Sequence, residues 1–207
     1  MSALKDWIAP SRTALLLVDM QVDFASPEGA MGREGQDMRL VQGAVRNALL
    51  LAEVAREKGV LLAFARLITR PGEESKVQKE WKARRGHEDD PPLCREGTKG
   101  AEFVGPRPLT GEAVFSKSRY NPFAGTGLDT YLRAKKRDTL VIAGLTTECC
   151  VDSAARSAFE RDYHIFIASD AVAAYQAELH QAALKALELN CAILASTRDI
   201  REAWKTR

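Results

Sequence analysis

The sequence contains few cysteines and histidines and no long apolar run. Its cysteines are Cys94, Cys149, Cys150 and Cys191, and with three histidines in 207 residues they form neither a C-x-x-C pair nor a group with zinc-ligand spacing. We therefore expect free thiols and no metal or other cofactor. No stretch reaches the ~18 apolar residues that suggest a membrane span, so a membrane partner is not expected.

Charge of one sign is not in excess either. Thirty Lys and Arg residues oppose 28 Asp and Glu residues, and the net charge of +2 is spread along the chain. Nucleic-acid binding needs basic residues gathered on one face, so this class of partner is not expected. The first residues, as far as Trp7, include an acid and lack the apolar segment of a secretory signal. These features predict a cytoplasmic protein.

Short apolar runs alternate with segments of helical periodicity along the chain. With 45% hydrophobic residues in 207, the chain is long enough to bury a core of its own. The runs predict strands over 13–18, 60–65, 113–116, 139–143, 165–168 and 191–195. Helices are predicted over 37–58, 128–136, 148–161, 177–189 and 198–205. The alternation predicts one doubly wound α/β domain over 1–207, with a parallel sheet of about six strands and helices on both faces.

The stretch 66–112 interrupts this alternation. It is polar and contains five prolines, and only 75–85 has the pattern of a helix. Loops of this length in compact domains are usually lids or binding loops, although a disordered segment is the alternative. We expect an active-site loop or lid here.

Polar residues follow three of the predicted strands, at the edge where open parallel sheets bind ligands. Asp19 follows the first strand, Lys117 the third, and the segment 144–151 (G-L-T-T-E-C-C-V) the fourth. A thiol at a helix start is expected to have a lowered pKa, and nearby N–H groups can stabilise an oxyanion. Together these residues supply an acid/base, a cation and a nucleophile for acyl transfer. Each also has a plain alternative: a strand-end cap, a solvated lysine and a cysteine that fills space.

Four blocks of sequence resemble the isochorismatase-like cysteine hydrolases, and the resemblance runs from about 13 to 195. The blocks are L-L-V-D-M-Q-V-D-F at 16–24, G-T-K-G-A-E at 97–102, K-S-R-Y-N-P-F-A-G-T-G-L at 117–128, and G-L-T-T-E-C-C-V at 144–151 with D-A-V downstream. The resemblance implies a catalytic triad of Asp19, Lys117 and Cys150. It also implies a cis peptide bond between Leu145 and Thr146, and an oxyanion hole formed by the N–H groups of Thr146 and Cys150.

Departures from the family pattern narrow the expected activity. The metal-binding Asp-x-His motif of nicotinamidases is missing after the second strand, and His87, His164 and His180 are scattered. Isochorismatases proper do not need the thiol, so the retained cysteine favours cleavage of a C–N bond. The blocks look most similar to the ureidoacrylate and N-carbamoylsarcosine amidohydrolases. The resemblance implies a small-molecule substrate, such as an amide, ureido or N-carbamoyl compound, and a homo-oligomer, dimer or tetramer.

Candidates for contacts with the substrate are Phe24, Trp81, Arg119 and Tyr120, with Arg119 suited to hold a carboxylate in two hydrogen bonds. Core packing is the alternative for Phe24 and Tyr120, and a salt bridge is the alternative for Arg119. His180 is interpreted as a helix-start residue. Two other functions stay open at this point: a vinyl-ether hydrolase driven by Asp19, and a binding subunit without turnover.

Overall fold

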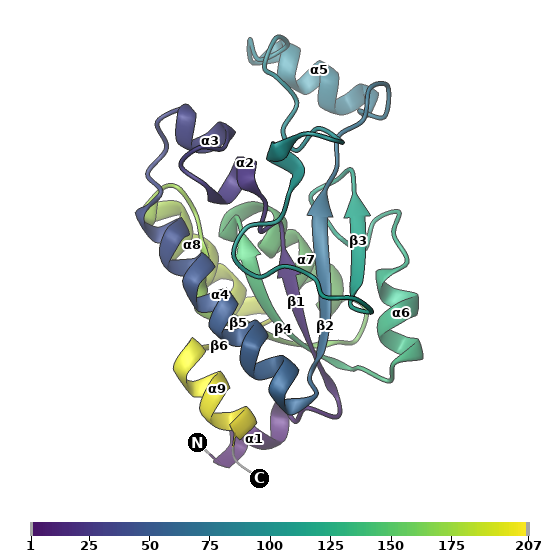
Figure 1. Ribbon diagram of the computed structural model, residues 1–207, viewed down its shortest axis with the longest axis vertical. Coiled ribbons are helices and arrows are strands. Elements are labelled where there is room, and N and C mark those ends of the chain that lie inside the picture. Colours follow the sequence, from purple (N-terminus) through teal and green to yellow (C-terminus); the bar gives the residue numbers. More distant parts are fainter. Residues whose placement is uncertain (1, 206–207) are drawn as a thin grey trace.

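The core of the protein is a six-stranded sheet with the strand order β3-β2-β1-β4-β5-β6, seen in a computed structural model that describes residues 2–205 (Figure 1). Every pair of neighbouring strands is parallel. The strands are β1 (Thr13–Val18), β2 (Leu61–Leu67), β3 (Ala113–Lys117), β4 (Thr139–Leu145), β5 (His164–Ala173) and β6 (Ile193–Ala195). The prediction of one doubly wound domain with about six parallel strands is confirmed.

Helices cover both faces of this sheet. The longer ones are α4 (Arg39–Lys58), α6 (Leu128–Ala134), α7 (Asp152–Phe159), α8 (Ala177–Asn190) and α9 (Thr197–Lys205). Shorter elements are α1 (Ser2–Trp7), α2 (Val22–Ala25), α3 (Ala30–Arg33), α5 (Lys76–Arg84), η1 (Lys99–Ala101) and the π-helical turn η2 (Thr147–Val151). Among the described residues, no helix combines the length and the apolar character that crossing a membrane would require.

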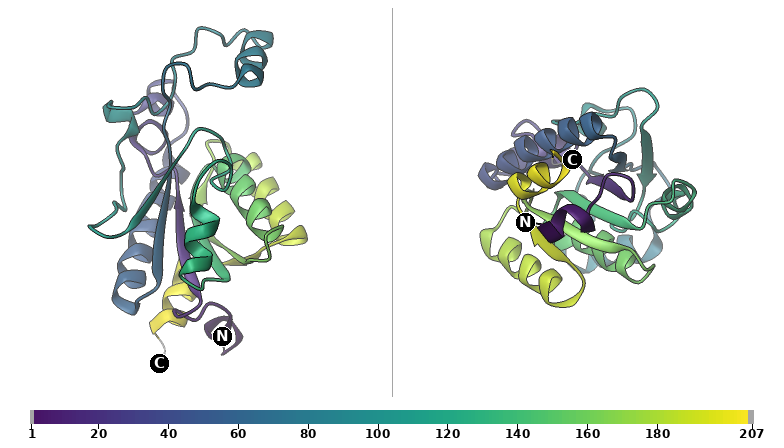
Figure 2. Two further views of the ribbon diagram at one scale, coloured as in Figure 1. Left: turned by 90° about the vertical axis from the view of Figure 1, so that its right-hand side faces the viewer. Right: turned by 90° about the horizontal axis from the view of Figure 1, so that it is seen from below.

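Successive side chains of each buried strand point to opposite faces of the sheet, which divides the core into two layers. In β1, Leu15 and Leu17 pack with α4 and α9, whereas Leu16 and Val18 pack with α6, α7 and α8. The edge-on view separates these layers, with α4 on one side of the sheet and α6 and α7 on the other (Figure 2). Both faces are covered, so the central strands are continuous apolar runs, which explains why the sequence predicted them well.

The centre of the sheet is the place where the strand order reverses. β1 and β4 lie side by side there, with Val18 opposite Gly144. The chain leaves β1 toward α4 on one face and leaves β4 toward α7 on the other, which makes the carboxyl ends of these strands the place where sheets of this kind bind ligands. Asp19 and the turn 145–151 therefore lie at the same edge of the sheet.

Several predicted boundaries change in the structure. The predicted helix 148–161 divides into η2 and α7, so the cysteine pair lies in a π-helical turn. Strand β5 extends to Ala173, beyond the predicted 165–168, because a register shift against β4 accommodates the polar residues Ser169 and Asp170. β6 is shorter than predicted, and α1, α2 and α3 were not predicted. These three helices have only four to six residues, too few to show a helical period.

Buried polar contacts attach the inserted segment 66–112 to the end of the sheet. The Gln21 amide donates to the carbonyls of Leu67 and Ala101 and accepts from the N–H of Leu67. Asp23 accepts hydrogen bonds from the N–H groups of Ala30 and Cys94. Two of the sequence blocks, 16–24 and 97–102, therefore hold each other in place.

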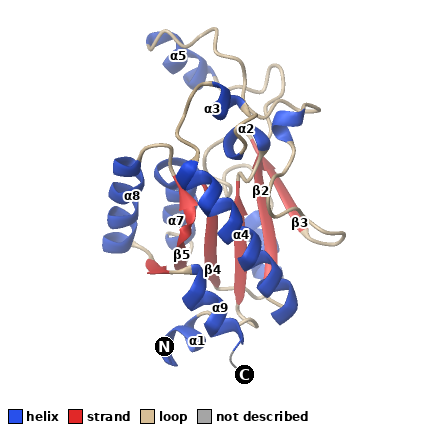
Figure 3. Ribbon diagram, turned by 60° about the vertical axis from the view of Figure 1, so that its left-hand side comes forward, coloured by secondary structure: helices blue, strands red, loops and turns tan. Residues whose placement is uncertain are grey.

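Helix α5 lies beyond this attachment and projects from the domain (Figures 1 and 3). A capping box formed by Ser75 and Gln78 fixes its start, as the sequence prediction of a helix over 75–85 anticipated. None of its residues is buried. Closure of 66–112 as a lid stays a prediction.

Gly144 is the position at which β1 and β4 approach too closely for a side chain. Its φ is +135°, and an added Cβ would lie 2.0 Å from the carbonyl oxygen of Val18. We expect Gly144→Ala to lower the free energy of unfolding by about 3 kcal/mol or more, because backbone atoms must shift. Gly43→Ala is the control, since the nearest atom to its added Cβ is 3.9 Å away. Gly43 lies within α4, so this change should stabilise by about 0.5–1 kcal/mol. Urea denaturation of both variants tests the contrast.

Candidate active site

The three residues predicted as a triad meet at the carboxyl edge of the sheet. The Lys117 ammonium donates to Asp19 Oδ2 over 2.7 Å and to Cys150 Sγ over 3.5 Å. Asp19 and Lys117 are 1% and 2% exposed, and Cys150 is 8% exposed. A carboxylate, an ammonium group and a thiol thus share one enclosed space.

Local backbone structure positions the two charged members. Asp19 directly follows β1 in a left-handed conformation with φ of +51°, and its N–H donates to the carbonyl of Ala65 at 2.9 Å. Lys117 ends β3, which is separated from β1 by β2. Its side chain therefore reaches past the end of one strand, and a third hydrogen bond of 3.0 Å to the Arg119 carbonyl fixes the ammonium group.

Electrostatics keep Lys117 charged in the resting site. Burial opposes its charged form, but the negative charge of Asp19 and the nearby Cys150 outweigh that effect, so the pKa of Lys117 is raised. Asp19 Oδ1 is buried and has no hydrogen-bond partner among residues 2–205. One carboxylate oxygen therefore holds the lysine while the other is available to accept a proton.

The Cys150 thiol is shifted in the opposite direction from the sequence-based expectation. Its hydrogen bond with Cys149, its burial and the negative charge of Asp19 raise its pKa well above that of an ordinary thiol, although Lys117 acts in the lowering direction. The expected lowering of the thiol pKa is therefore not found for Cys150, whereas the hydrogen bond with Cys150 lowers the pKa of the neighbouring Cys149. A thiol that holds its proton needs a base, and Asp19 is in place to serve as one.

The turn 145–151 connects β4 to α7 and carries the thiols. The peptide bond between Leu145 and Thr146 is cis, as the family resemblance implies. The N–H of Thr146 has no hydrogen-bond acceptor within residues 2–205, which suits a donor in an oxyanion hole.

His180 supports this turn from α8, a contact that sequence reasoning missed. It occupies the first turns of α8, as predicted, but its Nδ1 lies 2.9 Å from Thr147 Oγ1. Both residues are buried, and burial lowers the pKa of His180 so that the neutral imidazole is favoured. The two residues are 33 positions apart. No local motif signals such a contact.

A pocket opens beside the triad, between α5 and the loop that follows Lys117. Three of the four predicted substrate contacts line it: Trp81, Arg119 and Tyr120. Phe24 does not. Its side chain packs against the core and against a small cluster formed by Ile68, Cys94 and Ala101. A role for Phe24 in binding the substrate stays a prediction.

Metal ligands do not gather anywhere in the part of the chain that the structure describes. No three His, Cys, Asp or Glu side chains lie together there in a way that could hold an ion. His87 lies on the surface against Asp90, and His180 contacts Thr147. The expectation that the site works without a metal stays a prediction.

Fold and site together define a doubly wound α/β protein with an Asp-Lys-Cys arrangement at the switch point of its sheet. The sequence profile of the isochorismatase domain matches residues 13–199. The chain belongs to the isochorismatase family.

Named relatives and solved structures extend this comparison. Ureidoacrylate amidohydrolase RutB of Methylobacterium radiotolerans is 31% identical over 193 residues, which cover 86% of this chain and 74% of that protein. A cysteine hydrolase from Pseudomonas syringae pv. phaseolicola shares the fold with a TM-score of 0.82 at 23% identity, covering 96% and 95% of the two chains. N-carbamoylsarcosine amidase from Thermoplasma acidophilum has a TM-score of 0.71 at 26% identity, covering 90% and 96%.

Proposed function

We propose that this protein is a cysteine hydrolase that cleaves a C–N bond of a small ureido, N-carbamoyl or amide substrate through a thioester-type intermediate. The observation that carries the proposal is the Lys117 ammonium, which contacts both Asp19 Oδ2 and Cys150 Sγ in a buried site. A thiolate at Cys150 would form beside the negative charge of Asp19. The positive charge of Lys117, in contact with both groups, offsets that negative charge.

The first half of the reaction forms the intermediate. Asp19 takes the proton of the Cys150 thiol, and Lys117 stabilises the thiolate. The sulfur then attacks the substrate carbonyl carbon, and the N–H groups of Thr146 and Cys150 hold the oxyanion. As the tetrahedral intermediate collapses, the C–N bond breaks, and Asp19 gives its proton to the departing ammonia or amine.

The second half releases the acyl group. Asp19, again a carboxylate, takes a proton from a water molecule that attacks the thioester carbonyl. The C–S bond breaks, and the Cys150 sulfur leaves as a thiolate that recovers the proton from Asp19. Asp19 thus serves in turn as base and acid, which its free Oδ1 allows.

The substrate class is inferred from the relatives and from Arg119. The names of two relatives specify ureidoacrylate and N-carbamoylsarcosine, and each of these small compounds carries both a carboxylate and a carbamoyl group on nitrogen. Arg119 lines the pocket beside the triad, and its guanidinium contacts only Ser118 within the described residues. A guanidinium in this setting suits a substrate carboxylate.

A substrate panel tests the proposal. The panel contains ureido acids, N-carbamoyl amino acids and small primary amides, and the readout is ammonia release. We expect turnover of at least one ureido or N-carbamoyl acid, at the same rate after treatment with a strong chelator. Loss of activity with the chelator, and recovery with zinc, iron or manganese, would show that the site uses a metal. Binding without release of ammonia or amine from any compound would instead indicate a subunit without turnover.

A further inference from the structure

The pocket between α5 and the loop after β3 has walls that are more apolar than a small ureido acid requires. The apolar and aromatic residues of these walls are Leu67, Ile68, Trp81, Pro92, Leu93 and Tyr120, and the other lining residues are polar or charged. Trp81 and Tyr120 are 50% and 52% exposed, and the guanidinium of Arg85 lies over the Trp81 ring at 5.1 Å, so a ligand can reach both aromatic side chains only in part. Exposed aromatic groups that converge on one concave surface are typical of a binding site.

The volume of the pocket sets the size of the group that would fill it. It measures about 160 Å³. An apolar cavity of about 150 Å³ is known to hold one benzene ring. The pocket therefore has room for a single six-membered ring or a short branched alkyl chain in addition to the reacting group at Cys150.

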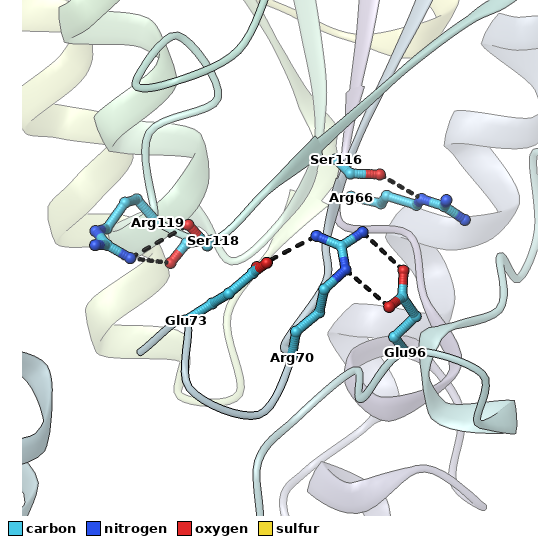
Figure 4. A network of polar contacts seen from close by, with 7 residues as sticks. All are labelled: Arg66, Arg70, Glu73, Glu96, Ser116, Ser118 and Arg119. Carbon is cyan, nitrogen blue, oxygen red and sulfur yellow. Dashed lines mark hydrogen bonds and ion pairs between the residues drawn. The ribbon is translucent and has the colours of Figure 1, made fainter. Parts of the chain in front are cut away.

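Of the three cations that line the pocket, one has no carboxylate partner among the described residues. Arg70 pairs with Glu73 and Glu96, as the close-up shows (Figure 4). Lys82 pairs with Glu74. Arg119 contacts only the hydroxyl and carbonyl oxygens of Ser118, and no carboxylate within the described residues reaches it. A ligand in the pocket would thus find one guanidinium ready for an anionic group.

The pocket is connected to the reacting groups through the loop that follows Lys117. The ammonium group of Lys117 donates to the carbonyl of Arg119, which fixes the pocket wall to the triad. Burial is the main cause that raises the pKa of Tyr120, and a thiolate at Cys149 or Cys150 would raise it further, which places Tyr120 near the two sulfur atoms. A substrate held at Cys150 would therefore extend past Tyr120 toward Trp81.

We infer that the preferred substrate is a ureido or N-carbamoyl acid that carries an aryl or branched alkyl group, with its carboxylate at Arg119 and its apolar group against Trp81 and Tyr120. This inference rests on the proposed function. It adds a substrate class that neither relative's name contains, and it makes Trp81 a specificity-determining residue.

Two N-carbamoyl amino acids test the inference because they differ only by a benzyl side chain. N-carbamoylglycine has the carboxylate and the carbamoyl group, and N-carbamoylphenylalanine, used as both enantiomers, adds a benzyl side chain. We expect kcat/KM of the wild-type protein to be about tenfold or more higher for one enantiomer of the phenylalanine compound. Trp81→Ala should remove most of this preference, mainly by raising KM for the phenylalanine compound more than KM for N-carbamoylglycine.

Two further variants separate the role of the Trp81 ring from a general effect on α5. Val77→Ala alters the same helix at a residue that is 73% exposed and does not line the pocket, so it should keep the preference. Trp81→Phe keeps an aromatic side chain in the pocket wall and should also keep most of the preference for N-carbamoylphenylalanine. Equal loss in Val77→Ala and Trp81→Ala would overturn the inference, as would a wild-type preference for the glycine compound.

Ligand binding to Cys150→Ala keeps this test independent of turnover. Calorimetry with both compounds should show tighter binding of N-carbamoylphenylalanine, and Trp81→Ala in the same background should reduce that difference. Tighter binding of N-carbamoylphenylalanine without turnover by the wild-type protein would refute the proposed function and support the assignment of the pocket to an apolar group. Turnover of both compounds with equal affinity would support the function and refute the pocket assignment.

Discussion

Cys150→Ala is expected to reduce C–N bond hydrolysis by at least about 10⁴-fold, because the removal of a nucleophile leaves only binding and oxyanion stabilisation. The fold should persist, since the thiol fills little space and the other members of its core cluster remain. The measurement is ammonia release from the best substrate of the panel at saturating concentration. Thermal unfolding checks that the variant is folded.

Cys149→Ser is the matched control for this change. Cys149 is the adjacent residue, but the Lys117 contact is made by Cys150. We expect the serine variant to retain most of the activity. In the wild-type protein, a small thiol-directed electrophile should give one adduct, on Cys150, because Asp19 can take the thiol proton during the attack even though the pKa of Cys150 is raised in the resting site. An adduct on Cys149, with activity retained in Cys150→Ala, would reverse the assignment.

The same variant distinguishes C–N bond hydrolysis from the other chemistry that Asp19 could support. A vinyl-ether hydrolase driven by Asp19 does not need the thiol. Its activity toward a vinyl-ether substrate should therefore survive Cys150→Ala. Survival of the main activity in this variant would remove the thioester from the mechanism and leave Asp19 as its centre.

Most of the sheet could be predicted because its signal is local. β1 and β4 are buried on both faces, so each is an unbroken apolar run that ends where the polar site begins. That pattern alone predicts that Asp19 and the turn 145–151 lie at one edge of the sheet. Lys117 was harder to place, because β3 is a short edge strand and its side chain must reach past β2.

The remaining features depend on contacts between residues distant in sequence. Gln21 forms hydrogen bonds with Leu67 and Ala101, and His180 forms one with Thr147. The sequence does not indicate which partner a side-chain amide or imidazole will have. The direction of the Cys150 pKa could not be predicted for a related reason. The sequence suggested a helix N-terminus, whereas the hydrogen bond with Cys149, burial and the carboxylate of Asp19 raise the pKa.

Lys117→Met is expected to nearly abolish turnover by removing the cation that stabilises the thiolate. A positive charge within ~4–6 Å of a thiol favours its ionised form. The pKa of Cys150, already raised in the wild-type protein, should therefore rise further. The rate of Cys150 alkylation measured against pH reports this shift. In the variant, the curve should move to higher pH, because deprotonation then occurs beside Asp19 without a compensating charge.

The substitution should also affect stability, because Lys117 and Asp19 form a buried pair at 2.7 Å. Removal of one partner leaves an uncompensated carboxylate in the core, which typically costs about 3–5 kcal/mol. Lys117→Met combined with Asp19→Asn removes both charges and should recover much of the stability without recovering turnover. Lys99→Met is the surface control, since Lys99 pairs with the exposed Glu28 and should change neither property. An alkylation curve that does not move in folded Lys117→Met would show that Lys117 does not act on the thiol, and the chemistry would then rest on Asp19 and Cys150 alone.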